Sequence, residues 1–158
     1  YRVLGADHLE FIDEEGVKAL AQAGSVAVLL PGAFYMLKEV QKPPVEWFRK
    51  HQVPMALASD CNPGSSPMLS LLLAMNMGCL LFGLTLEEAF AGVTKHAARV
   101  LGLSHTATLE VGKQADCVLW DASHPRELIA SLGINPCQKV FKKGRMIYER
   151  QSQGFSFD

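Results

Sequence analysis

Apolar and polar segments alternate along the first part of the chain in the order expected for strands that are followed by helices. Short continuous apolar runs bounded by turn residues predict buried strands at 2–6, 25–30 and 53–59. Longer segments with capping residues predict helices at 13–23, 45–51, 67–82 and 86–101. Three strand–helix units in succession favour a parallel sheet with right-handed crossovers, and therefore an α/β fold.

Local signals mark the ends of two of these helices. Asp13 is a preferred residue for capping the start of the first helix, and Gly24 is suited to the left-handed turn that closes it. Thr85, followed three positions later by Glu88, predicts a capping box at the start of the last helix.

Two apolar features are harder to interpret. Pro31 and Gly32 are expected to end the second strand and begin a loop, in which Phe34 and Tyr35 either line a pocket or pack into the core. Apolar residues also recur at helical spacing in the helix 67–82, which predicts a core-facing stripe. The stripe consists of Met68, Leu71, Leu72, Met75 and Leu80.

After residue 105 the pattern changes to short apolar segments separated by turn residues. These predict strands at 108–113 and 115–120 and a hairpin over 140–148 that turns at Lys143 and Gly144. We therefore divide the chain into an α/β part, a small β unit and a frayed tail, at 1–105, 106–150 and 151–158. Because three parallel strands cannot cover their own faces and edges, we expect further strands upstream and a poorly stable isolated chain.

Composition excludes several classes of partner and site. The net charge is −1 and the basic residues are scattered, which argues against nucleic acid and anionic membranes. The apolar stretch 68–84 contains Asn76 and Gly78 and is expected to be a buried helix, not a membrane span. The four cysteines form no Cys-x-x-Cys pair, so we expect reduced thiols in the cytoplasm and neither disulfides nor a structural zinc site.

The loop 58–66 carries the most informative chemistry. Asp60 and Asn62 follow the third predicted strand directly, and α/β barrels carry their catalytic groups at the carboxyl ends of strands. The alternative is that Asp60 only starts a turn and caps the helix that begins near Pro67, since Asp and Asn often do so. The histidines other than His8 are weaker candidates for a catalytic role, and His96 is expected to be a partly buried, hydrogen-bonded side chain.

Several segments carry a resemblance to a known family. The more specific ones read Ala6-Asp7-His8-Leu9-Glu10 and Asp60-Cys61-Asn62-Pro63-Gly64-Ser65, and a third reads Leu29-Leu30-Pro31-Gly32-Ala33-Phe34-Tyr35. Two others, 94–102 and 112–121, are shared by many amidohydrolases. Together they make the chain similar to the carboxyl-terminal part of the imidazolonepropionases, a family of the amidohydrolase superfamily.

The resemblance implies a fold, a cofactor and a reaction. The fold would be the last three strand–helix units of a metal-dependent (β/α)8 TIM barrel, with part of a small composite β domain. One zinc or iron ion would support hydrolysis of 4-imidazolone-5-propanoate to N-formimino-L-glutamate in histidine degradation. The family's other metal-binding histidines belong to upstream sequence.

The resemblance also assigns roles to five residues. Asp60 would bind the metal and accept the proton of the attacking water, and His8 would orient the substrate carbonyl or carry a proton. Asn62, Gly64 and Ser65 would contact the substrate through an amide, a close backbone approach and a hydroxyl. A turn-forming role for these three residues is compatible with that function.

Two other functions stay open. An amidohydrolase of the same superfamily would act on another cyclic amide or on an aminated ring. A non-catalytic fragment or interaction module is the alternative from a different class, because one expected ligand is fewer than the three or four of a stable metal site. We expect a small-molecule substrate, no nucleic acid or membrane partner, and an inactive isolated chain, and we leave a homodimer open.

Overall fold

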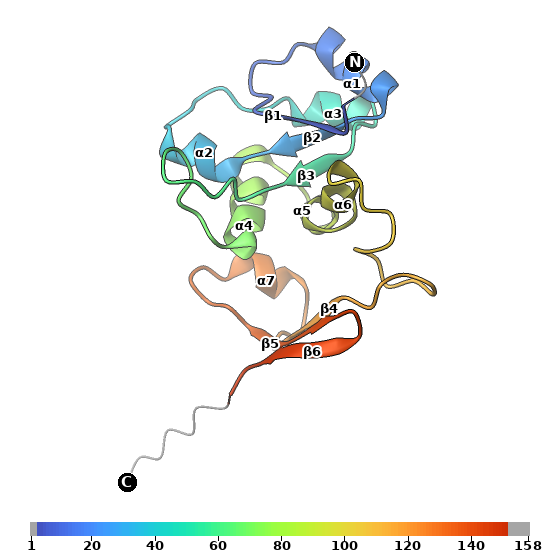
Figure 1. Ribbon diagram of the computed structural model, residues 1–158. Helices are drawn as coiled ribbons and strands as arrows, with labels where there is room; N and C mark the ends of the chain where they lie inside the picture. Colours follow the sequence, from blue (N-terminus) through green and yellow to red (C-terminus); the bar gives the residue numbers. More distant parts are fainter. Residues whose placement is uncertain (1–2, 152–158) are drawn as a thin grey trace.

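The computed structural model describes residues 3–151 and contains two small sheets with helices around and between them (Figure 1). Arg2, at the start of the first predicted strand, lies outside the described residues. The same holds for 152–158, which make up nearly all of the predicted tail. The mixed α/β class expected from the sequence is confirmed.

The first sheet consists of three parallel strands in the order β1 (Gly5–Asp7), β2 (Val26–Leu29) and β3 (Met55–Leu57). They are paired in register, with Val28 of β2 opposite both Asp7 and Ala56. All of β2 and β3 is buried, as expected for parallel strands that helices cover. The parallel sheet is confirmed, although its strands are shorter than predicted and β1 begins later.

Two helices form where the local signals predict them. In α1 (Glu14–Ala23), Oδ1 of Asp13 accepts a hydrogen bond from the Gly16 backbone N–H at 2.8 Å, and Gly24 closes the helix with a φ of 69°. The predicted helix after Pro44 is α3 (Val45–Lys50). Both predictions hold because a cap or a helix-compatible proline acts within a few residues.

The loop predicted after the second strand is instead a short helix, α2 (Pro31–Met36). Proline is tolerated in the first turn of a helix, where its missing N–H has no intrahelical partner, so Pro31 starts this helix. Phe34 consequently points into the core, whereas Tyr35 is exposed. The interpretation of Phe34 and Tyr35 as loop residues was therefore wrong.

The helix predicted at 67–82 begins later, as α4 (Leu71–Phe82). The hydroxyl of Ser70 caps it by accepting from the Leu73 N–H at 3.2 Å. The predicted core stripe is wrong in part, because Met75 is buried but Leu71 and Leu80 are 48% and 73% exposed. An almost wholly apolar helix has no polar face from which its buried side can be inferred.

The helix predicted at 86–101 is divided into α5 (Leu86–Val93) and α6 (Lys95–Val100). The break is at Thr94, whose φ of −122° and ψ of −100° lie outside helical values. The predicted capping box is present, since the Glu88 N–H donates to the Thr85 hydroxyl and the Thr85 N–H donates to the Glu88 carboxylate.

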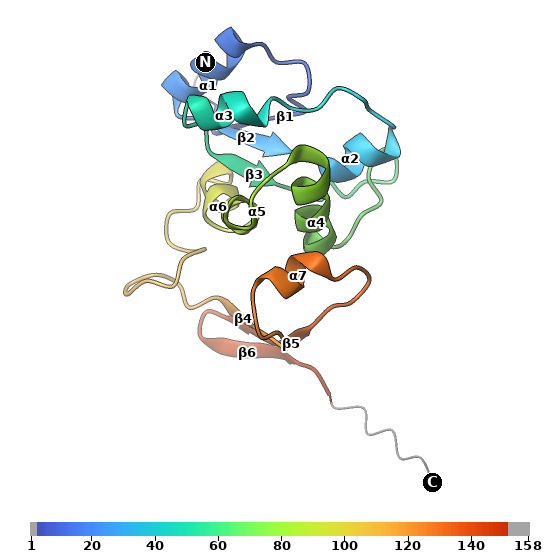
Figure 2. The same cartoon turned by 180° about the vertical axis from the view of Figure 1, so that it is seen from behind.

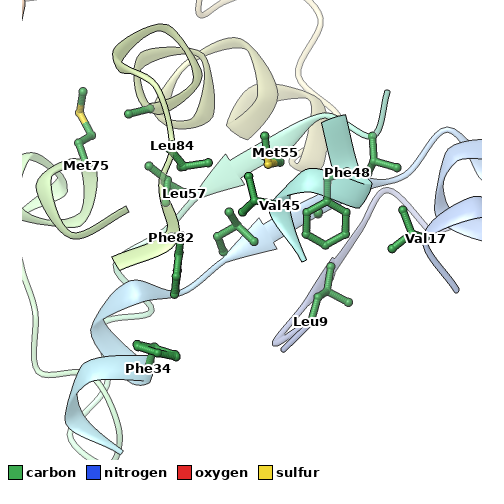
Figure 3. Close-up of a cluster of buried hydrophobic side chains, with 14 of the residues drawn as sticks. Leu9, Val17, Phe34, Val45, Phe48, Met55, Leu57, Met75, Phe82 and Leu84 are labelled. Carbon is green, nitrogen blue, oxygen red and sulfur yellow. The ribbon is translucent and has the colours of Figure 1, made fainter. Parts of the chain in front are cut away.

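The main core joins the first sheet to α1–α5 (Figure 3). Phe48 and Val17 are fully buried on one side of it, and Leu57 and Met75 are almost fully buried on the other. Phe34 of α2 meets Phe82 of α4 edge to face, with ring centroids 5.1 Å apart.

The second sheet is antiparallel, in the order β4 (Cys117–Trp120), β5 (Cys137–Lys142) and β6 (Arg145–Glu149). The predicted hairpin at Lys143 and Gly144 is confirmed, and both residues have positive φ angles of 53° and 73°, as a tight hairpin turn requires. The strand predicted at 108–113 is wrong, because that segment forms turns.

A helix that the sequence did not predict, α7 (Arg126–Ala130), lies between α4 and the second sheet in both views (Figures 1 and 2). The buried side chain of Asn76 in α4 donates to the Ile129 carbonyl of α7 at 2.8 Å. This hydrogen bond ties the two parts of the chain together and accounts for a polar residue in an apolar helix. None of the helices within residues 3–151 has the length and apolar character needed to cross a membrane.

Candidate functional site

Two of the predicted site residues lie at one edge of the first sheet. His8 follows the last residue of β1, and Asp60 lies three residues beyond the end of β3. Because the strands are parallel and in register, both positions are at the carboxyl edge, with β2 between them. Adjacent strands are about 4.8 Å apart, so the two chain segments leave the sheet about 10 Å from each other.

His8 and Asp60 share an unusual backbone conformation. Their φ angles are 54° and 49°, in the left-handed region that non-glycine residues seldom occupy. Each such residue costs roughly 1–2 kcal/mol relative to ordinary backbone. Backbone strain of this kind persists where surrounding contacts stabilise it and is frequent at functional sites.

Asn62 is the centre of the loop that follows β3. Its side-chain Oδ1 accepts hydrogen bonds from the backbone N–H groups of Gly64 and Ser65, at 2.9 Å and 2.8 Å. Its Nδ2 donates to the Asp60 carbonyl at 2.7 Å and to Oδ2 of Asp60 at 3.2 Å. The Asn62 side chain thus folds the loop into a turn and orients the Asp60 carboxylate.

The structure rules out one part of an interpretation of Asp60 that the sequence left open. The helix after the loop is capped by Ser70, ten positions after Asp60, so the interpretation of Asp60 as its cap is wrong. Asp60 is half-buried at the edge of the sheet, with Asn62 and the hydroxyl of Ser65 beside it in one hydrogen-bonded cluster.

The predicted substrate-contacting residues lie together, but they differ in accessibility. Gly64 is exposed, and Ser65 and Asn62 are partly buried. The hydroxyl of Ser65 lies 3.1 Å from Nδ2 of Asn62. Ser65 and Asn62 therefore already contact each other, and Gly64 presents open backbone at the loop surface.

His8 is brought to the same edge without being held there by side-chain contacts. Its imidazole is exposed, and within residues 3–151 it has no hydrogen-bond partner. Within the described chain, His8 is thus not a histidine whose ring is held by a hydrogen bond to the backbone. The description does fit His96, whose Nδ1 lies 2.9 Å from the Met55 carbonyl oxygen.

The donor set for a metal is partial. No three side chains of His, Cys, Asp or Glu gather in the described part of the chain as a metal-binding group requires. Asp60 offers a carboxylate oxygen, a ligand that suits zinc or iron when imidazoles complete the set. The residues present therefore fit one position of a metal site.

Sequence reasoning missed two residues that define the shape of the loop. The side chain of Ser66 is fully buried and donates to the Ser59 carbonyl at 2.6 Å. Gly32, at the start of α2, lies so close that an added Cβ would be 2.4 Å from the Ser66 hydroxyl oxygen. Small residues in both segments were the available signal, but only the fold brings them into contact.

A large cavity lies elsewhere in the described part of the chain. It has a volume of about 1080 Å³ and is lined by residues of α4, α7 and the second sheet. Its lining is mainly apolar and includes Leu73, Phe90, Trp120, Ile134 and Val140. None of the five predicted site residues lines it, so its size does not make it the candidate site.

Comparison with known sequences connects nearly all of the described chain to one enzyme family. Residues 2–148 match the model of the amidohydrolase family. An imidazolonepropionase from Ruegeria pomeroyi is 60% identical over 139 residues, which are 88% of this chain and 35% of the relative. One from Bradyrhizobium diazoefficiens is 58% identical over 146 residues, 92% of this chain and 36% of the relative. The chain thus spans about a third of the length of these relatives.

Solved structures show the same fold at low sequence identity. A zinc-bound adenosine deaminase from Xanthomonas campestris matches with a TM-score of 0.80 and 22% identity, over 90% of this chain and 36% of that chain. A variant of atrazine chlorohydrolase from Arthrobacter aurescens, complexed with zinc and atraton, matches with a TM-score of 0.81 and 18% identity, over 92% of this chain and 36% of that chain. The guanine deaminase of E. coli matches with a TM-score of 0.76 and 20% identity, covering 93% and 39% of the two chains.

Proposed function

The chain belongs to the amidohydrolase family, and we propose that it is the carboxyl-terminal part of an imidazolonepropionase. The complete protein would hydrolyse 4-imidazolone-5-propanoate to N-formimino-L-glutamate. One observation carries the proposal: the Asp60 loop lies at the carboxyl edge of a parallel sheet in a chain 60% identical to an imidazolonepropionase over 88% of its length. The alternative of a non-catalytic module offers no reason for this loop to hold a carboxylate at that edge.

Opening an imidazolone ring by hydrolysis breaks a C–N bond of an amide-like group. The reaction needs an activated water, a polarised carbonyl and a proton for the departing nitrogen. One zinc or iron ion, when bound, would supply a Lewis acid for the carbonyl and lower the pKa of a water molecule. Asp60 would hold this ion through one carboxylate oxygen, together with ligands from the remainder of the protein.

Asp60 is also suited to receive the proton that the attacking water loses. Its carboxylate is half-buried and is oriented by the Asn62 amide at 3.2 Å, so it does not have to reorganise during the reaction. The proton would then pass to the departing nitrogen, which completes the C–N cleavage. A positioned carboxylate can take both roles when it lies within hydrogen-bond reach of both groups.

His8 would act on the substrate from the other side of β2. One ring N–H of its exposed imidazole can donate to the substrate carbonyl, or a ring nitrogen can carry a proton. Asn62, Gly64 and Ser65 would contact the ring amide and the propanoate carboxylate through the loop. The exposed backbone at Gly64 suits close approach of a planar ring.

The fold of the complete protein is part of the same proposal. Residues 1–105 would supply the last three strand–helix units of a TIM barrel, and 106–150 would supply strands of a composite β domain, followed by the tail 151–158. The exposed apolar residues of α4 and the apolar lining of the large cavity support further covering elements. We place the protein in the cytoplasm with a small-molecule substrate, and leave homodimerisation open.

The test uses the complete natural polypeptide that contains this segment. Turnover of 4-imidazolone-5-propanoate is measured for the parent and for Asp60→Asn, with bound zinc and iron quantified in both proteins. Asp121→Asn, in the turn after β4, serves as the control for removing an aspartate charge. We expect turnover by the parent and by Asp121→Asn, and loss of turnover and of bound metal in Asp60→Asn.

Two outcomes would contradict the proposal. A folded, metal-loaded parent without turnover would direct attention to other cyclic amides and aminated rings, which should be assayed in parallel. An Asp60→Asn protein with the turnover and metal content of the parent would remove Asp60 from the site.

A further inference from the structure

We infer that Ser66 is a positioning residue that holds the Asp60 backbone in its left-handed conformation, and that Gly32 is the position that makes room for it. This inference rests on the proposed function, because it assigns a consequence to the geometry of Asp60. It is based on the peptide bond between Ser59 and Asp60, which links the Ser59 carbonyl to the Asp60 N–H.

The hydroxyl of Ser66 acts on the peptide bond that precedes Asp60. It donates to the Ser59 carbonyl oxygen at 2.6 Å, and that carbonyl belongs to the same planar unit as the Asp60 N–H. Rotation of this unit changes φ of Asp60 directly. A hydrogen bond that fixes the Ser59 carbonyl therefore stabilises the φ of 49° that Asp60 adopts.

The backbone of Ser66 closes the same loop from its other end. Its carbonyl accepts from the Asn62 N–H at 2.9 Å, and the two residues form an isolated antiparallel bridge. Side chain and backbone of Ser66 thus hold both Ser59 and Asn62, the neighbours of the Asp60-Cys61 pair. Because Ser66 is fully buried, its hydroxyl has no water to replace this bond.

The space for this arrangement is provided by Gly32. A Cβ at position 32 would lie 2.4 Å from the Ser66 hydroxyl oxygen and 2.8 Å from Cε of Met68. The methionine can move, but the hydroxyl has to leave the Ser59 carbonyl to avoid the contact. The first turn of α2 is therefore shaped to receive the loop after β3.

The chain contains a matched serine at the other end of the sheet. Ser25, just before β2, is also fully buried and also donates its hydroxyl to a backbone carbonyl at 2.6 Å, that of Val3. Substitution of Ser25 removes the same kind of hydrogen bond from the same fold. It does so at the amino-terminal edge, away from Asp60.

The experiment compares Ser66→Ala, Gly32→Ala and Ser25→Ala in the complete natural polypeptide. Zinc affinity is measured by competition with a chelator, kcat and KM with 4-imidazolone-5-propanoate, and folding by thermal unfolding. We expect Ser66→Ala to weaken zinc binding about tenfold and to lower kcat about tenfold. Losses of this size in metal affinity and in rate are typical when a metal ligand or a catalytic group is displaced. KM should change less than about twofold, since ground-state binding is not removed.

Gly32→Ala should reproduce the losses of Ser66→Ala, although it keeps the hydroxyl. Ser25→Ala should lower the unfolding temperature by as much as Ser66→Ala and leave zinc affinity and kcat as in the parent. The inference is overturned if Ser66→Ala and Ser25→Ala have the same zinc affinity and kcat. If Ser66→Ala does not fold, the same comparison is made between Gly32→Ala and Ser25→Ala.

Failure of the inference and failure of the proposed function can be told apart. A parent that binds zinc but does not turn over the imidazolone contradicts the proposed function, and the zinc affinities of the variants still decide the role of Ser66. A parent that turns over the substrate, with Ser66→Ala no different from Ser25→Ala, contradicts only the inference. A parent that neither binds zinc nor turns over the substrate overturns both.

Discussion

The side-chain nitrogen of Asn62 lies 3.2 Å from Oδ2 of Asp60 and 2.7 Å from the Asp60 carbonyl oxygen. One amide therefore orients both the carboxylate and the backbone of the residue that we propose as metal ligand. Among the described residues, none donates a hydrogen bond to the other carboxylate oxygen, Oδ1. The loop thus restrains Asp60 through one carboxylate oxygen and donates no hydrogen bond to the second.

Replacement of Asn62 by alanine should disrupt this arrangement. Asn62→Ala removes the acceptor for the Gly64 and Ser65 N–H groups as well as the donor to Asp60, so the loop loses its turn. We expect zinc affinity and kcat/KM of the complete protein to fall about 10–100-fold, as for other groups that orient metal ligands.

Asn135 offers a matched control for this substitution. Its Oδ1 accepts from the Cys137 N–H at 3.0 Å, which is the same two-residue turn at a distance from the candidate site. Asn135→Ala should leave zinc affinity and kcat/KM unchanged. Equal effects of the two substitutions would mean that the Asn62 turn has no special relation to Asp60.

Glu88 is predicted to stabilise the fold in a pH-dependent manner. Its carboxylate forms two hydrogen bonds with Arg49, at 2.8 Å and 2.7 Å, which lower its pKa below the ordinary value of 4.5. Burial opposes this shift, and the Thr85 N–H adds to it. Because the folded state favours the charged form, Glu88 contributes stability above its unfolded-state pKa, and the contribution is lost as the pH falls through the folded-state pKa.

Glu88→Gln should therefore lower the free energy of unfolding by about 1–2 kcal/mol at pH 7, and by less in acid. The two side chains are 30% and 24% exposed, so solvent screens the pair only in part. Urea unfolding at pH 7 and pH 4 measures the difference. Glu15→Gln is the control, because Glu15 is 79% exposed in its pair with Lys18 and should contribute almost nothing.

Gly92 should resist substitution although it lies in a helix. A Cβ there would be 3.2 Å from the Leu57 backbone nitrogen and 3.4 Å from the Met55 carbonyl oxygen, in the buried strand β3. Helix propensity alone predicts that Gly92→Ala stabilises the protein by about 1 kcal/mol. Because the contacts are with backbone that cannot move away, we expect a net loss of about 1–3 kcal/mol.

Gly78 provides the comparison for Gly92. Its added Cβ would meet side-chain methyl groups of Leu57, at 3.0 Å and 3.1 Å, which can adopt other rotamers. Thermal unfolding should show a smaller loss for Gly78→Ala than for Gly92→Ala. The opposite order would contradict the close packing of α5 on β3.

Phe34 and Phe82 should be energetically coupled. Their rings meet at an interplanar angle of 81° and join α2, which contains Gly32, to α4 (Figure 3). A double-mutant cycle with Phe34→Leu and Phe82→Leu should give a coupling energy of about 0.5–1.5 kcal/mol in urea unfolding. In a second double-mutant cycle, which pairs Phe34 with Phe48, the two losses of unfolding free energy should be additive, because Phe48 lies elsewhere in the same core. Coupling of equal size in both cycles would contradict a direct ring contact.

Elements with strong local signals were predictable from the sequence. The ends of α1 follow from Asp13 and Gly24, and the hairpin follows from Lys143 and Gly144, because each signal acts within a few residues. The parallel sheet follows from three buried apolar runs separated by helices. The sequence therefore determined that a carboxylate and an imidazole, Asp60 and His8, leave the sheet at one edge.

Errors arose where a local pattern is compatible with more than one structure. Pro31 breaks a strand but also starts a helix, so α2 was missed. The apolar stretch 67–82 is compatible with helix throughout, and only the Ser70 cap shows that α4 begins at Leu71. The break at Thr94 has no strong breaker such as glycine or proline to announce it.

The shape of the candidate site was decided by tertiary structure alone. Gly32 lies far from Ser59 and Ser66 in the sequence, and its contact with Ser66 exists only after β2 and β3 have paired. We propose that the contacts of Ser66 stabilise the left-handed backbone of Asp60, a conformation that costs free energy relative to ordinary backbone. The sequence by itself determined which groups reach the edge of the sheet, and the packing of one loop against the next determined how they are held there.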